Sequence, residues 1–170
     1  MNCALEDSKH HLYLEDLRVG QRFTSDVYTL EKNQIFAFAS EFDPQPFHLD
    51  EAAAASTFFG ELVASGWHTA AITMRLLVSG GLPIAGGLIG AGAEIKWPKP
   101  TRAGDILRVE SVVQEVNPSR SHPDRGMILV RSETRNQRDE IVQVLVAKVV
   151  VPRRLAEKGE IASAVCEPSA

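Results

Sequence analysis

The segment from residue 67 to residue 78 constrains the fold more than any other part of the chain. Its sequence is WHTAAITMRLLV, so a helix built from it is apolar on almost every side. A helix with so little polar surface is stable in water only when other structure covers it. Ser79, Gly80 and Gly81 then end the helix. The rest of the chain must therefore supply a layer that wraps around it.

Extended segments that follow this helix can supply the layer. Four of them alternate in hydropathy or are rich in β-branched residues, which indicates strands. They are residues 88–97, 106–116, 127–135 and 141–151. In the last strand, Val142, Val144 and Val146 fall on one face. A hairpin loop is predicted at 136–140 and a longer polar loop at 117–126. One apolar helix against a mainly antiparallel sheet is an α+β arrangement.

The part of the chain before the apolar helix predicts shorter elements. Residues 21–28 predict a strand, and residues 30–42 predict a helix with Thr29 as its N-cap. The apolar face of that helix would carry Ile35, Phe38, Ala39 and Phe42. A short Ala-rich helix is predicted to begin at Asp50, a good N-cap, and to end by Gly60.

The length of 170 residues suits one domain with a sizeable core, which we place at residues 13–152. Residues 1–12 and 153–170 lack periodic apolar patterns and are predicted to be flexible tails. Cys3 and Cys166 lie in these tails, where two free thiols are expected, and this favours a reducing, cytoplasmic setting.

Charge and hydropathy exclude two kinds of partner. The net charge is −4 and no stripe of Lys and Arg is present, so we expect no nucleic-acid binding. Every apolar stretch is broken well short of the ~18 residues that a membrane span needs. We therefore expect no membrane association.

A carboxylate and an imidazole lie close together in a proline-rich run, Asp43-Pro44-Gln45-Pro46-Phe47-His48. The two prolines cannot continue the preceding helix, and they stiffen the loop that carries Asp43 and His48. Histidine titrates near neutral pH, and a partly apolar pocket can raise the pKa of an aspartate. The pair is therefore a candidate acid/base couple, although a surface or capping histidine is the alternative for this pattern alone.

This run resembles the signature of the MaoC-like family of (R)-specific enoyl-CoA hydratases. That signature is an aromatic-Ala helix end followed by Asp-x-Asn-Pro-[apolar]-His-x-Asp. The matching residues are Asp43, Pro46, Phe47, His48 and Asp50, whereas Gln45 stands where the family usually has Asn.

Two further segments extend the resemblance from Phe38 to Asp105. Residues 62–67, LVASGW, are similar to the family's Val-x-His-Gly-Met turn into the central helix, with Ser65 in place of His. Residues 96–105, KWPKPTRAGD, are similar to its Lys-Phe-x-x-Pro-Val-x-x-Gly-Asp. The resemblance implies a single hot-dog domain, an antiparallel sheet wrapped around a long apolar central helix.

The resemblance also implies a function. A hydro-lyase of this family interconverts trans-2-enoyl thioesters and (R)-3-hydroxyacyl thioesters. Asp43 would be the base toward water with His48 as its partner, and shared or reversed roles remain alternatives. The backbone N–H of Gly66 would bind the thioester oxygen. The residues expected to contact substrate are Gln45, Phe47, Ser65 and Trp67.

The implied partners follow from the same resemblance. Coenzyme A, or an acyl-carrier protein, would enter as part of the substrate, with no metal or redox cofactor. A homodimer or higher homo-oligomer is expected, formed by sheets that pair edge to edge. A hot-dog acyl-CoA thioesterase and a non-catalytic acyl-CoA-binding protein remain alternatives, because one fold can host several activities.

Six other polar residues have structural explanations beside functional ones. We expect Asp50 to cap a helix, His68 to be structural or to line the acyl tunnel, and Asp105 to fix the turn after Gly104. A basic cluster would either be solvated or meet the phosphates of coenzyme A. Its members are Lys96, Lys99 and Arg102.

Overall fold

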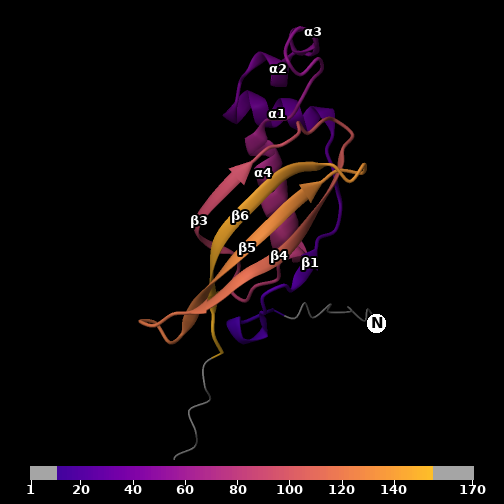
Figure 1. The fold of residues 1–170 in the computed structure, drawn as a ribbon. Helices are drawn as coiled ribbons and strands as arrows, with labels where there is room; N and C mark the ends of the chain where they lie inside the picture. The colour runs from indigo at the N-terminus through magenta and orange to yellow at the C-terminus, as the bar shows by residue number, and fades with distance from the viewer. Residues whose placement is uncertain (1–10, 155–170) are drawn as a thin grey trace, which may run out of the picture.

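A curved antiparallel sheet lies across one helix in the described part of the chain, which is residues 11–154 of the computed structural model. In chain order the elements are η1 (Leu14–Asp16), β1 (Arg22–Thr24), β2 (Tyr28–Thr29), α1 (Lys32–Phe42), α2 (Pro46–Leu49), α3 (Glu51–Ala55), α4 (Gly66–Leu76), η2 (Leu77–Gly81), β3 (Ile89–Lys96), β4 (Ile106–Pro118), β5 (Arg125–Arg135) and β6 (Ile141–Pro152). The sheet covers α4, and α1, α2 and α3 lie together beyond one end of it (Figure 1).

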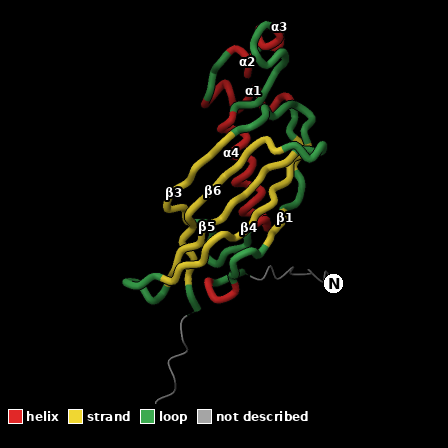
Figure 2. The backbone as a smooth tube through the Cα atoms, viewed as in Figure 1, coloured by secondary structure: helices red, strands yellow, loops and turns green. Residues whose placement is uncertain are grey.

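The strand order of the sheet is β1–β4–β5–β6–β3, with β2 also paired to β4. Every pairing is antiparallel. The predicted α+β class, an antiparallel sheet around a central helix, is therefore confirmed, as Figure 2 shows with α4 behind the strands. β3 pairs with β6 alone among the described strands, so one edge of the sheet is free.

The core lies between the concave face of the sheet and α4. β5 alternates buried and half-buried residues along its length, which places Ile128 and Val130 in the core. Val109 of β4 joins them, and α4 contributes Ile72 and Leu76. The side chains that face this core recur every two residues along the strands and about every 3.6 residues along the helix.

Helix α4 has one covered side and one open side in this single chain. It begins at Gly66 and ends at Leu76, and the π-helical turn η2 continues the chain to Gly81. The buried face consists of His68, Thr69, Ile72, Thr73 and Leu76. On the opposite face, Trp67 and Met74 are 60% and 46% exposed.

The prediction of one strand over residues 21–28 is wrong, because β1 and β2 are separated by a break at Ser25. The Ser25 hydroxyl donates to the carbonyl of Asp26 at 2.6 Å and accepts from the N–H of Val109 at 2.9 Å. The Ser25 side chain thus accepts a hydrogen bond from Val109 that a backbone carbonyl of the neighbouring strand would otherwise accept. The contact joins residues far apart in sequence, so a local pattern cannot show it.

Helix α1 begins later than predicted. Thr29 belongs to β2, and the N-cap is Glu31, whose N–H donates to Oε1 of Gln34 at 2.9 Å. Ile35 and Ala39 are buried on the predicted face. Phe42 is 64% exposed instead, because the helix ends there, beyond the layer that it packs against.

The predicted loop before His48 contains a helical turn. Pro46 begins α2, where its missing N–H is no loss, and His48 lies on this turn. Asp50 caps α3 as predicted, since its Oδ1 accepts from the N–H groups of Ala52 and Ala53 at 2.7 and 3.0 Å.

The four later strands begin and end within two residues of their predicted bounds. Most of the two predicted tails, with Cys3 and Cys166, lies outside the described residues. Where the tails are described they make contacts. Leu12 forms a β-bridge with Ile84, and Arg154 pairs with Asp16 at 2.7 Å.

Candidate active site

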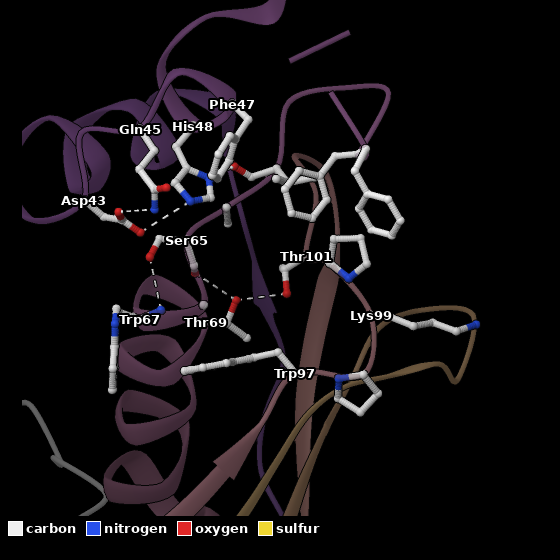
Figure 3. Close-up of a pocket in the computed structure, with 17 residues that line it drawn as sticks. Asp43, Gln45, Phe47, His48, Ser65, Trp67, Thr69, Trp97, Lys99 and Thr101 are labelled. Atoms are coloured by element: carbon white, nitrogen blue, oxygen red, sulfur yellow. Dashed lines mark hydrogen bonds and ion pairs between the residues drawn. The ribbon is translucent and has the colours of Figure 1, made fainter. Parts of the chain in front are cut away.

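An open cavity of about 390 Å³ forms where the end of α1, α2, the start of α4 and the loop after β3 meet (Figure 3). All seven residues predicted for the site line it, namely Asp43, Gln45, Phe47, His48, Ser65, Gly66 and Trp67. They belong to two separate runs of sequence. The fold brings these runs together and adds a third wall from residues 97–101.

Asp43 and His48 face each other at this cavity. Nε2 of His48 lies 3.4 Å from Oδ2 of Asp43, and their side chains are 6% and 18% exposed respectively. Asp43 is the C-cap of α1, and His48 lies on α2. Two helices in sequence thus fix the separation of the pair, which is shielded from bulk water but borders the cavity.

A backbone contact sets the tautomer of His48. Its Nδ1 lies 2.7 Å from the carbonyl oxygen of Val63. A carbonyl oxygen can only accept, so Nδ1 carries the proton of this bond. In the neutral imidazole the lone pair is then on Nε2, the nitrogen nearest Asp43. His48 is therefore arranged to take up a proton at Nε2.

The pKa of the Asp43 carboxyl lies below its ordinary value. The Ser65 hydroxyl lowers it most, by hydrogen bonding, while burial opposes this effect. Gln45 and His48 lower it further, and Nε2 of Gln45 donates to Oδ1 of Asp43 at 2.7 Å. The expectation of a raised pKa is therefore wrong, because hydrogen bonds to the charged form outweigh desolvation. Asp43 is a carboxylate at neutral pH.

Removal of the Ser65 hydroxyl is expected to raise the pKa of Asp43. Because the folded-state pKa is lowered, the carboxylate persists above that pKa and is lost only as the pH falls through it. Ser65→Ala removes the largest lowering contribution, so Asp43 should protonate at a higher pH. A ¹³C NMR titration of the Asp43 carboxyl measures this directly. Ser40→Ala, at an exposed serine of α1, is the control, and equal titration curves for both variants would contradict the account.

Gly66 presents backbone rather than a side chain to the cavity. As the first residue of α4, its N–H has no acceptor within the helix. The Ser65 hydroxyl caps the helix at the neighbouring N–H, that of Trp67, at 3.2 Å. A Cβ on Gly66 would lie 2.8 Å from Cε2 of Trp97, so the wall leaves no room for a side chain. The residue can thus offer an N–H at the positive end of a helix.

The other predicted substrate contacts form the walls of the cavity. Phe47 packs edge-on against His48, with ring centroids 4.5 Å apart, and it also contacts Phe59. Trp67 lies nearly perpendicular to Trp97, with centroids 5.4 Å apart. Phe47 thus supports the imidazole, and the two tryptophans form a wall at the start of α4.

Several wall residues are not among the predicted site residues, and Thr69, Trp97 and Thr101 are three of them. The Thr69 hydroxyl lies 3.0 Å from that of Thr101, and both residues are buried. Thr69 follows Ser65 by one helical turn, so the spacing could have identified it. The position of Trp97 depends on the sheet register and carries no comparable local signal.

Two polar residues outside the cavity have structural roles. The ring of His68 stacks on Phe38 with centroids 4.5 Å apart, and burial lowers the pKa of His68. Asp105 is buried, and its Oδ2 accepts from the N–H of Arg102 at 2.8 Å, which confirms its predicted role in the turn. Within residues 11–154, no three His, Cys, Asp or Glu side chains are grouped to hold a metal ion.

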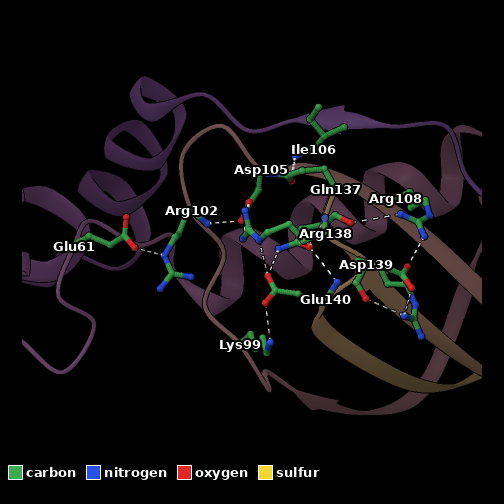
Figure 4. A network of polar contacts seen from close by, with 12 residues as sticks. Glu61, Lys99, Arg102, Asp105, Ile106, Arg108, Gln137, Arg138, Asp139 and Glu140 are labelled. Atoms are coloured by element: carbon green, nitrogen blue, oxygen red, sulfur yellow. Dashed lines mark hydrogen bonds and ion pairs between the residues drawn. The ribbon is translucent and has the colours of Figure 1, made fainter.

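Each residue of the predicted basic cluster has a carboxylate partner. Lys99 pairs with Glu140 at 2.7 Å and Arg102 with Glu61 at 2.5 Å, as Figure 4 shows. Lys96 pairs with its neighbour Glu94 at 2.8 Å. Hydrogen bonds from Asn136, Lys99 and Arg138 lower the pKa of Glu140 to about 2. Of the three basic residues, Lys99 lines the cavity.

The chain is similar to several known proteins in sequence and structure. A family model described as "MaoC like domain" matches residues 17–135. The crystal structure of a MaoC-like dehydratase from Rhodospirillum rubrum superposes with a TM-score of 0.84 and 61% identity, covering 85% of this chain and 99% of that one. The R-hydratase PhaJ1 from Pseudomonas aeruginosa superposes with a TM-score of 0.67 and 29% identity, covering 86% and 93%.

A curated relative adds a sequence match. The 3-hydroxybutyryl-CoA dehydratase of Methylorubrum extorquens is 34% identical over 113 residues, which are 64% of this chain and 68% of that protein. Among the helices of residues 11–154, none combines the length and hydropathy of a membrane span.

Proposed function

The chain belongs to the MaoC-like domain family, and from this membership we propose that it is a hydro-lyase acting on acyl thioesters. The proposed reaction interconverts trans-2-enoyl-CoA and (R)-3-hydroxyacyl-CoA by addition or removal of water. Coenzyme A takes part as a portion of the substrate. The observation that carries the proposal is that Asp43, His48 and Gly66 border one cavity.

Hydration of an enoyl thioester needs a base for water, an acid for Cα and a donor for the developing enolate oxygen. Asp43 and His48 are close enough to hold one water molecule between them, because their nearest polar atoms are 3.4 Å apart. The water donates one hydrogen bond to the carboxylate and one to Nε2 of His48, which both accept in these states.

The proton transfers then follow from the tautomer of His48. The water oxygen bonds to Cβ as its proton passes to Nε2 of His48, and the C=C electrons move toward the thioester carbonyl. The N–H of Gly66 stabilises the resulting oxyanion. The Asp43 carboxylate stabilises the imidazolium, which then returns a proton to Cα. The sum is the addition of one water molecule, with His48 as the proton carrier and Asp43 as its charged partner. We thus propose the reverse of the expected roles, in which Asp43 is the base toward water.

The test uses the purified chain and crotonyl-CoA, with the enoyl thioester absorbance and free thiol followed together. We expect the absorbance to fall without release of thiol. Thiol release with the enoyl group intact would indicate a thioesterase instead. Tight binding of acyl-CoA with neither change would indicate a non-catalytic binding protein. Either of these results contradicts the proposal.

The assembly that we propose is a homodimer paired through β3. This strand has β6 on one side and no described strand on the other, and its residues are almost all exposed. A free edge strand readily pairs with another chain. Analytical ultracentrifugation should show a dimer for the wild type and a monomer for Ala93→Pro, which removes a backbone donor in β3. A monomeric wild type at assay concentration is the contrary result.

A further inference from the structure

We propose that Trp97 forms the end wall of the acyl pocket and restricts this site to short-chain enoyl thioesters. The inference rests on the proposed function, and it concerns which acyl groups the cavity admits. Two cavities along α4, and a polar layer at the level between them, support it.

The two cavities lie at successive levels along α4. Thr69 of α4 lines the site cavity, whereas Met74 and Leu77 line a second cavity of about 280 Å³. At a rise of about 1.5 Å per residue, Met74 lies about 7.5 Å farther along the helix than Thr69. The second cavity has apolar walls from β3, β5 and β6, which include Ala93, Val130, Leu145 and Val149, and from Leu82 just after η2. This second cavity could hold the end of an extended acyl chain if it were continuous with the site cavity.

Three hydrogen-bonded side chains form a layer at the level between the two cavities, and one of them, Trp97, lines the site cavity. The indole Nε1–H of Trp97 donates to Oε1 of Gln143 at 2.8 Å. Nε2 of Gln143 in turn donates to the Thr73 hydroxyl at 3.0 Å. The layer thus runs from the end of β3 across β6 to α4, at the level between Thr69 and Met74.

The bonds of this layer hold its members in fixed positions. Gln143 and Thr73 are fully or almost fully buried, with exposures of 1% and 0%. The Thr73 hydroxyl donates to the carbonyl of Thr69 at 2.9 Å, so Thr134, 2.6 Å away, must be the donor in its own bond to Thr73. Both ends of the Gln143 amide are satisfied. A rotation of the Trp97 indole would leave a buried acceptor unpaired, which is unfavourable.

The indole also lies directly against the start of α4. A Cβ on Gly66 would be 2.8, 2.9 and 3.2 Å from three ring carbons of Trp97. A thioester whose oxygen is bound at the Gly66 N–H therefore has this ring beside it. An acyl tail that runs from there along the sheet side of α4 meets the indole, which is 40% exposed in the single chain. The layer of Trp97, Gln143 and Thr73 thus sets the length of the acyl chain that the site accepts. The volume of the second cavity does not set it.

The test compares kcat/KM for trans-2-octenoyl-CoA with that for crotonyl-CoA in the wild type, Trp97→Ala, Trp97→Leu and Trp97→Phe. We expect the wild type to favour crotonyl-CoA by at least about tenfold, since even one methylene group can change selectivity by this much. Trp97→Ala and Trp97→Leu should move the ratio toward octenoyl-CoA by about tenfold or more. Trp97→Phe keeps a ring in the wall and should keep the short-chain preference.

A general loss of activity lowers kcat/KM for both substrates and leaves their ratio unchanged. Circular dichroism identifies the variants that fold. If the wild type hydrates octenoyl-CoA as well as crotonyl-CoA, or if the ratio stays constant in a folded Trp97→Ala or Trp97→Leu, the inference is overturned while the proposed function stands. A wild type that hydrates neither substrate overturns the proposed function, and the inference with it.

Discussion

Asp43→Asn should lower kcat/KM for crotonyl-CoA by at least about a hundredfold, because it removes the charge that stabilises His48 as the proton carrier. The substitution keeps the shape of the side chain but removes its negative charge. The neutral amide cannot stabilise a protonated His48 that lies 3.4 Å away. Both carboxylate oxygens accept hydrogen bonds, whereas the amide NH2 group donates and cannot accept one from the water. Initial rates from the loss of enoyl absorbance measure the effect.

His48→Ala should cost at least as much, because it removes the group that carries the proton. Asp50→Asn is the matched control, since it changes a carboxylate two residues away whose role is to cap α3, and Asn is an equally good cap. The control should keep wild-type rates. Wild-type rates in Asp43→Asn or His48→Ala would remove the pair from the mechanism.

Gly66→Ala should lower kcat for crotonyl-CoA by about 10²–10³, the range for loss of one oxyanion donor. The added methyl group would lie 2.8 Å from Cε2 of Trp97, so the start of α4 or the indole must shift. A displacement of the N–H by a fraction of an ångström disturbs the reacting geometry more than it disturbs substrate binding. The expected signature is a fall in kcat with a much smaller change in KM.

A second glycine supplies the control for this substitution. Gly90→Ala adds the same methyl group in β3, where no atom lies within 4 Å of the new Cβ. It should fold and turn over crotonyl-CoA as the wild type does. Equal kcat values for Gly66→Ala and the wild type would show that the Gly66 N–H does not stabilise the transition state.

The sequence predicts the residues that border the site because they lie in short runs with local constraints. Proline fixes the path from Asp43 to His48, and a serine followed by glycine begins the helix at Gly66. These features depend on neighbours along the chain. The later strands are predicted well for the same reason, since alternating burial is a local pattern.

Contacts between distant segments account for what the sequence does not predict. The pKa of Asp43 is lowered mainly by Ser65, which lies on another element. The break between β1 and β2 depends on the bond between Ser25 and Val109. The layer of Trp97 and Gln143 depends on the register of β3 against β6. Each is a tertiary contact that no window of local sequence contains.

The most direct test of the account is the fate of oxygen when the chain acts on crotonyl-CoA in ¹⁸O-labelled water, analysed by mass spectrometry. We expect an intact 3-hydroxybutyryl-CoA with one label in the hydroxyl at C3, formed at least about a hundredfold faster by the wild type than by Asp43→Asn. Free coenzyme A with a label in a released carboxylate would contradict this expectation, because water would then have attacked the thioester carbonyl rather than Cβ.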